Sequence, residues 1–223
     1  MNELYLIVEI LIIFSMVVLS YRFFGKYGLF AWIAIATILA TIQVTKQVTV
    51  FGLDVTMGNV LFASTFLATD ILNEKLGFKH SRKGVYIGLF SVICFLVVSQ
   101  ITLLFKPNSF DLVSGSMNTL FSLSPRVCIS SVIMFFLANL LDVYLFEYLK
   151  KHFPKHLWLR NNVATLVSNC LENFVFTLGA FMFIYPIQDC MIIALNTCII
   201  EIFIGLCDTP FLYLVKKLRK GDV

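Results

Sequence analysis

The stretch TLVSNCLENF, residues 165–174, decides how this chain must be understood, because it carries polar groups inside an otherwise apolar segment. A carboxylate, Glu172, stands there with two amides, Asn169 and Asn173. Their spacing of i, i+3 and i+4 places all three on one face of an α-helix. The segment is therefore predicted to be a helix with one polar face, and the rest of the chain indicates what that face meets.

The composition is that of a membrane protein. The 223 residues are 59% hydrophobic and 13% charged, with a mean hydropathy of +0.90, whereas a soluble domain is about 45–50% apolar and about 25% charged. The basic residues are dispersed in short loops, which argues against direct nucleic-acid binding. The six cysteines stand singly in apolar segments, which favours packing over metal binding or disulfides. P-loop, HExxH and GxSxG motifs are absent, so neither an enzyme nor a cofactor is predicted.

Seven segments are long and apolar enough to be predicted as membrane spans, each of which needs about 20 residues. They should be helices, because every backbone polar group in lipid must be paired within its segment. The fold class is therefore all-α, a polytopic transmembrane bundle in a single domain of residues 1–223. The first segment lacks the basic flank of a signal peptide and is interpreted as an anchor helix. The segments are 4–21, 29–49, 55–73, 84–105, 122–149, 163–185 and 187–215.

The distribution of basic residues predicts an orientation with the N-terminus outside and the C-terminus in the cytoplasm. With seven spans, fourteen of the 17 Lys and Arg fall in cytoplasmic loops, and Lys46, Lys106 and Arg126 remain outside. This asymmetry follows the positive-inside rule. The outer loop 106–126 is predicted to be irregular and able to fold over a site as a lid. The fourteen are Arg22, Lys26, Lys75, Lys79, Arg82, Lys83, Lys150, Lys151, Lys155, Arg160, Lys216, Lys217, Arg219 and Lys220.

Four of the predicted helices carry acidic or amide residues along one face. A charge at the centre of a membrane helix costs about 2.5–3.5 kcal/mol, so such residues usually face a cavity or a partner. Carboxylates and amides with few cations favour a planar, polar heterocycle rich in N–H donors, with Phe and Tyr rings to stack on it. The alternative is that they only join helices by hydrogen bonds. The candidate substrate-binding residues are Asp70, Asn139, Asp142, Asn169, Glu172, Asn173, Glu201 and Asp208.

Three further charged residues have separate interpretations. Arg126 lies in the first turn of a helix predicted to begin at Pro125, where a cation opposes the helix dipole. It either pairs with an acid such as Asp111 or serves an outer gate or ligand contact. Glu9, alone in the first segment, is interpreted as a helix-packing residue, and Lys46 as a side chain that extends to the membrane surface.

Two long stretches resemble the queuosine precursor transporter family, which is also described as vitamin uptake transporters. They are FLATDILNEKLGFKHSRKGVYIG at 66–88 and the stretch from SPRV to ENFVF at 124–176, and CDTPFLYL at 207–214 resembles the family's closing helix. The resemblance covers residues 29–215 in the same order. It implies a six-span core, so that residues 1–28 are an additional N-terminal span and its connecting loop.

The resemblance implies a function as well as a fold. Members of the family import 7-deazaguanine bases across the bacterial inner membrane for tRNA modification: the 7-cyano and 7-aminomethyl precursors of queuosine, or queuine. Alternating access around a site near the middle of the membrane is the simplest mechanism. Glu201 stands where many relatives carry a basic residue, so an amine-bearing base is the expected preference. The family's polar positions match Asp70, Arg126, Asp142, Asn169, Asp208 and, as an acid, Glu172.

Other readings of the sequence stay open beside this one. The chain could be the substrate-binding membrane subunit of an ATPase-driven vitamin or nucleobase uptake complex, or a non-transporting assembly or sensor protein. The expected partners are the lipid bilayer and a small purine-like base, and a homodimer is one oligomeric state left open.

Overall fold

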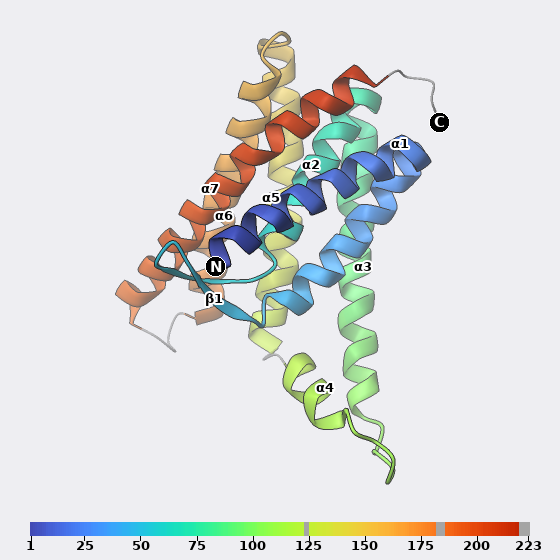
Figure 1. Cartoon of the computed structure of the whole chain (residues 1–223), viewed down its shortest axis with the longest axis vertical. Helices are drawn as coiled ribbons and strands as arrows, with labels where there is room; N and C mark the ends of the chain where they lie inside the picture. The colour runs from blue at the N-terminus through green and yellow to red at the C-terminus, as the bar shows by residue number, and fades with distance from the viewer. Residues whose placement is uncertain (123–124, 182–185, 219–223) are drawn as a thin grey trace.

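The computed structural model describes residues 1–122, 125–181 and 186–218, with the side chains of all of these except 125–128 and 180–181. The described residues form seven helices and one short β-hairpin (Figure 1). The long helices pack against one another at oblique angles, and the N-terminus lies beside the hairpin. The elements are α1 (Asn2–Gln43), β1 (Gln47–Val50), β2 (Leu53–Thr56), α2 (Asn59–Leu76), α3 (Phe78–Leu103), α4 (Ser114–Phe121), α5 (Pro125–His152), α6 (Leu157–Phe181) and α7 (Ile187–Lys217).

Helix α1 is 42 residues long and folds back on itself at Gly25. The backbone there has φ 57° and ψ −138°, a conformation open to glycine because it has no β-carbon. A β-carbon on Gly28 would lie 2.1 Å from the carbonyl oxygen of Ser20, so the two arms also need a glycine where they meet. The two arms, blue in Figure 1, correspond to the first two predicted membrane segments.

The hairpin corrects the prediction of a helix as far as residue 49. Helix α1 ends at Gln43, and β1 then pairs antiparallel with β2 so that Val50 stands opposite Leu53. Phe51 and Gly52 between them both have positive φ, 51° and 75°, as a two-residue type I′ turn requires. Val and Thr dominate both strands, and β-branched residues favour extended chain over helix.

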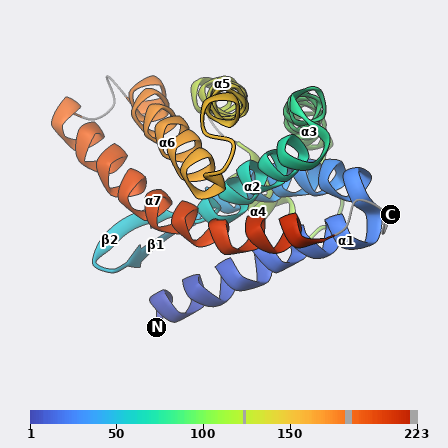
Figure 2. The same ribbon diagram turned by 90° about the horizontal axis from the view of Figure 1, so that it is seen from above.

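Helix α2 occupies the centre of the bundle. Every residue from Val60 to Asn73 is buried except Phe62, and the helix contacts α1, α3, α5 and α7, which surround it in Figure 2. Its buried polar residues include Ser64 and Asp70. Because protein rather than lipid covers α2 on most sides, it can be short and polar and still lie inside the bundle.

Four helices in the described part of the chain are long and apolar enough to cross a membrane: α1, α3, α5 from Ile129 onward, and α7. Helices α2 and α6 correspond to two more of the predicted segments but are more polar, because both turn polar faces toward the interior. The prediction of a helical bundle is confirmed, and each predicted segment corresponds to a helix or to an arm of α1.

The loop 106–126 is more ordered than predicted, since it contains α4. The Asp111 carboxylate accepts hydrogen bonds from the backbone N–H groups of Val113 and Ser114, at 2.8 and 2.9 Å, and from the Ser114 hydroxyl at 2.6 Å. These bonds hold the pKa of Asp111 below its usual range, and the bond from the Ser114 hydroxyl has the largest effect. An acid accepting N–H groups at a helix start stabilises that helix, which explains why this segment is not irregular.

Most of the basic turns lie at one end of the bundle. The Lys75 ammonium donates to the carbonyl oxygens of Lys216 and Leu218, at 3.0 and 2.6 Å, so the α2–α3 turn meets the end of α7. The α5–α6 turn and the α1 bend lie at the same end, uppermost in Figure 1. We call this the basic end, and the opposite end, which carries the hairpin, the hairpin end. Arg219 and Lys220 lie outside the described residues.

The replacement Gly28→Ala tests the close contact in the α1 bend. The added methyl group would overlap the Ser20 carbonyl oxygen, and overpacking of this kind lowers the free energy of unfolding by about 1–3 kcal/mol. Thermal unfolding of the purified protein in micelles measures the effect. Gly115→Ala in α4 is the matched control, because nothing lies within 4 Å of its added methyl group. Equal melting temperatures for the two variants would contradict the tight bend.

Candidate functional site

Three aspartates from different helices meet inside the bundle. Asp70 on α2, Asp142 on α5 and Asp208 on α7 are all fully buried, and the charge of Asp70 interacts with those of the other two. We call them the aspartate cluster. Their placement confirms that the predicted polar faces of α2, α5 and α7 are turned toward one interior.

Helix α6 supplies the hydrogen-bond donors of the aspartate cluster. The Asn161 amide donates to one oxygen of Asp208, and the Thr165 hydroxyl donates to one oxygen of Asp142 at 3.3 Å. Both oxygens of Asp70 and the second oxygens of Asp142 and Asp208 are buried and accept no N–H or hydroxyl donor among the described atoms, while the carboxyl groups of Asp70 and Asp142 are close enough to share a hydrogen bond with each other. A buried acceptor that lacks a hydrogen bond costs free energy. The cluster can therefore accept further N–H donors or a proton.

A second group lies between α6 and α7, and we call it the glutamate cluster: Glu172, Asn173 and Glu201. The Asn173 amide donates to a carboxylate oxygen of Glu201 at 2.6 Å, and the two side chains are 6% and 4% exposed. Glu172 interacts electrostatically with Glu201 and has a buried oxygen, Oε2, without a partner. The polar face of α6 is therefore turned to α7 rather than to lipid.

Two other predicted residues behave differently. Asn139 accepts a hydrogen bond from the Thr65 hydroxyl at 3.1 Å and donates to the Phe135 carbonyl at 3.0 Å. Both ends of its amide are thus used, as expected of a residue that joins α2 to α5. Asn169 is buried, and its Oδ1 has no described partner. Helix α5 begins at Pro125 as predicted, but the side chain of Arg126 lies outside the described residues.

At the basic end Glu74 joins four helices, an arrangement that was not singled out from the sequence. Its carboxylate lies 3.0 Å from Arg160 Nη2, 3.7 Å from Lys150 Nζ and 3.6 Å from Lys216 Nζ. We call this the Glu74 knot; it ties α2 to α5, α6 and α7. Arg160, only 2% exposed, lies over the Phe146 ring. The knot closes the basic end of the polar interior.

A cavity of about 260 Å³ opens at the hairpin end, between the start of α1, the hairpin, the start of α2 and α7. None of the eight predicted substrate-binding residues lines it, although Ile200 beside Glu201 does. Glu9 and Lys46, both interpreted from the sequence as structural, line it as well, whereas no residue of α4 does. Its lining comprises Asn2, Tyr5, Leu6, Glu9, Lys46, Val48, Val50, Val55, Thr56, Met57, Gly58, Asn59, Val60, Ile200 and Ile204.

No group of His, Cys, Asp and Glu within the described ranges has the arrangement of a metal site. The acidic side chains instead form a polar seam, with the glutamate cluster nearer the hairpin end and the aspartate cluster nearer the Glu74 knot. Carboxylates and amides without a metal suit the recognition of a small, donor-rich molecule that passes between helices.

Comparison with known proteins agrees with this arrangement. Residues 56–215 match the family model described as "Putative vitamin uptake transporter". The chain belongs to this family. It is 40% identical over 223 residues to the "Probable queuosine precursor transporter" of Bacillus subtilis (strain 168), an alignment that covers 99% of this chain and 97% of the relative. No solved structure shows a significant match.

The family assignment confirms the resemblance noted in the sequence. The chain is a multi-pass membrane protein of a transporter family and not an enzyme. The alignment with the Bacillus relative extends over nearly the whole chain, so it includes the N-terminal arm of α1 and the hairpin, which precede the residues matched by the family model.

Breaking the Glu74 knot should destabilise this transporter strongly. Glu74→Ala leaves the buried Arg160 guanidinium without its carboxylate, and removing one partner of a buried ion pair costs about 3–5 kcal/mol. Unfolding of the purified protein in micelles measures the loss. In the control, Glu147→Ala removes a pair with the exposed Lys151, 3.8 Å apart, for which about 0–1 kcal/mol is expected. Similar losses in the two variants would show that the knot is not a buried ion pair.

Proposed function

We propose that this protein imports 7-deazaguanine bases, the cyano or aminomethyl precursors of queuosine or queuine, across the bacterial cell membrane. The observation that carries the proposal is the 40% identity to the Bacillus relative along nearly the whole chain, together with the name of that relative. The acid and amide chemistry of the interior supports it, because a deazaguanine offers N–H donors to a carboxylate and a carbonyl to an amide.

The proposed topology has seven crossings, with the N-terminus and hairpin outside and the basic end in the cytoplasm. Two crossings come from the arms of α1, which at 42 residues is long enough for both. The others are α2, α3, α5, α6 and α7. The gathering of the basic turns at one end supports this orientation, because basic residues are retained on the cytoplasmic side.

In the proposed mechanism the base is bound in turn by groups along the polar seam. Within the seam the glutamate cluster holds it nearer the hairpin end, with Glu201 accepting its N–H donors and Asn173 turning from Glu201 to the base. Hydrogen bonds to a charged group contribute about 1.5–3 kcal/mol each. The aspartate cluster lies farther toward the cytoplasm, beyond which the Glu74 knot must part for release. An open cavity at the hairpin end and a closed basic end correspond to an outward-facing state.

The replacement Glu201→Gln should reduce import by about tenfold, because it weakens one charge-assisted hydrogen bond. The measurement is the queuosine content of tRNA in a bacterial host that can neither make nor import the base, given nanomolar precursor or queuine. Wild-type protein should restore the modification. Glu147→Gln, outside the seam, should match wild type at equal membrane abundance. If no supplied base restores queuosine despite good expression of the wild-type protein, the proposed function is wrong.

The same variant tests which base is preferred. An acid at position 201 attracts an amine, so wild-type protein should import the aminomethyl base better than the cyano base when the two compete. Glu201→Gln should remove much of that preference. The ratio of the two initial uptake rates is the readout, and an unchanged ratio would rule out Glu201 as the group that selects the amine.

A further inference from the structure

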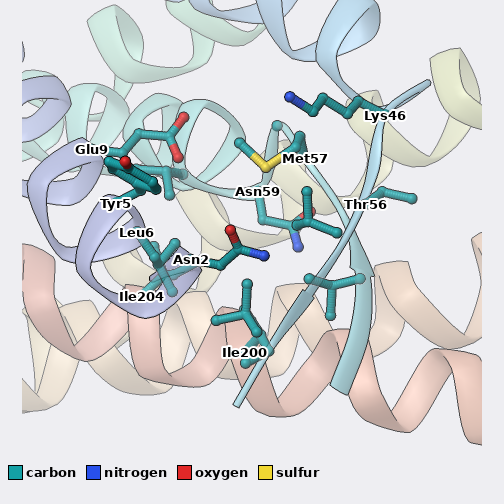
Figure 3. A pocket seen from close by; sticks show the side chains of 15 residues that line it. Asn2, Tyr5, Leu6, Glu9, Lys46, Thr56, Met57, Asn59, Ile200 and Ile204 are labelled. Atoms are coloured by element: carbon teal, nitrogen blue, oxygen red, sulfur yellow. The ribbon is translucent and has the colours of Figure 1, made fainter. Parts of the chain in front are cut away.

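The cavity at the hairpin end is lined in part by two charged side chains, Glu9 and Lys46, that have no partner within the described part of the protein. Figure 3 shows the Glu9 carboxylate entering from α1 and the Lys46 ammonium from the opposite wall, with Met57 between them. Glu9 is half-buried and Lys46 is exposed, and neither side chain has an ion-pair or hydrogen-bond partner in the described part of the chain. Two opposite charges that face one cavity without pairing leave room for a ligand that contacts both.

Asn59 also lines the cavity, at the first position of α2. Its Nδ2 atom has no partner among the described atoms but is itself buried, so it is not open to a ligand as the side chain stands. The N-cap residue of α2, Gly58, supplies no side-chain cap, and the first backbone N–H groups of a helix lack partners within it. The start of α2 therefore borders the cavity with donors that lack acceptors.

The apolar part of the cavity lining and the volume of the cavity indicate the size and shape of ligand that it can hold. Tyr5 and Leu6, with a small contribution from Ile200, provide apolar surface, on which a flat ring can rest. The volume of about 260 Å³ lies just below the range of about 300–1,000 Å³ typical of small-molecule pockets. A single fused ring system suits this space better than a nucleoside or a nucleotide.

The two walls are held in place by the hairpin. The Asn2 amide donates to the Thr49 carbonyl oxygen at 2.8 Å, and the Phe51 N–H donates to the Glu3 carboxylate at 3.3 Å. Phe51 also packs edge-on against Phe203 of α7. These contacts fix the N-terminal arm, which carries Glu9, relative to the hairpin end that carries Lys46.

We propose that this cavity is an outer binding site for the transported base, in which Glu9 accepts two N–H donors of its amidine edge while Lys46 donates to its carbonyl. The assignment rests on the proposed function and adds to it a site separate from the polar seam. Most of the residues that shape it precede residue 56, where the family match begins. The outer site recognises the amidine and carbonyl edge that all 7-deazaguanines share. Glu201 recognises the group at position 7.

Initial uptake rates of the radiolabelled cyano and aminomethyl bases, measured over a range of concentrations, test the outer site. Glu9→Gln and Lys46→Gln should each raise KM about tenfold for both bases and leave Vmax within twofold of wild type. Lys106→Gln, which removes an exposed charge of the loop after α3, should leave both parameters within twofold. Membrane abundance of each variant is measured in parallel.

A competitor isolates the contact made by Glu9. The analogue 7-deazahypoxanthine lacks the exocyclic amine and so offers one N–H donor where the substrates offer a pair. It should inhibit the wild-type protein at least tenfold more weakly than 7-deazaguanine, from which it differs only in that amine, and this difference should shrink in Glu9→Gln. A folding defect would not change the ratio of the two inhibitors.

The outcomes separate the two proposals. If wild-type protein takes up the bases but KM stays within twofold in both variants, or only Vmax falls, the outer site is wrong and the proposed function stands. If wild-type protein takes up neither base, the proposed function and the outer site fall together.

Discussion

An acidic side chain in a membrane-embedded helix must be covered by protein, and the arrangement of this bundle depends on that constraint. A carboxylate exposed to lipid costs several kcal/mol, and the seam contains five: those of the aspartate cluster, Glu172 and Glu201. The helices that carry them are packed so that these faces meet. Helix α2 lies in the centre, and the apolar helices α1, α3 and α7 provide surface for lipid.

The two ends of the seam differ in a way that suits a transporter. Three cations converge on one carboxylate in the Glu74 knot and join four helices at the basic end. At the hairpin end, two charged groups face an open cavity without partners in the described part of the chain. The seam between them has buried acceptors without N–H or hydroxyl donors, which suits the donor-rich ligand of the proposed function. In the proposed mechanism the base leaves through the basic end, and the Glu74 knot would have to break for that end to open.

Much of the fold could be predicted from hydropathy and helical spacing. The apolar segments mark the helices, and the spacing of Asn169, Glu172 and Asn173 correctly places their face in the interior. What was missed depends on local backbone chemistry: the hairpin between β-branched runs with its Phe51–Gly52 turn, and α4 with Asp111 at its start. The α1 bend could be foreseen as a loop but not as a kink at Gly25.

The site was predictable only in part, for a different reason. Spacing along a helix identifies which residues share a face, and position along each predicted span gives their depth, so that Asp70, Asp142 and Asp208, all near the same ends of their spans, could be grouped in advance. It does not show which faces of separate helices enclose a space. Glu9 and Lys46 are isolated in the sequence, and only the folded α1 and the hairpin bring them to one cavity. The same applies to Glu74, whose three cations come from distant parts of the chain.

The central claim is that this chain alone carries a 7-deazaguanine base across a membrane. Uptake of the radiolabelled aminomethyl base into liposomes that contain only the purified protein tests it most directly. The account predicts saturable uptake above that of empty liposomes, slowed by Glu201→Gln and not by Glu147→Gln. Binding of the base without uptake would contradict the claim and would indicate a substrate-binding subunit that needs a separate energising partner.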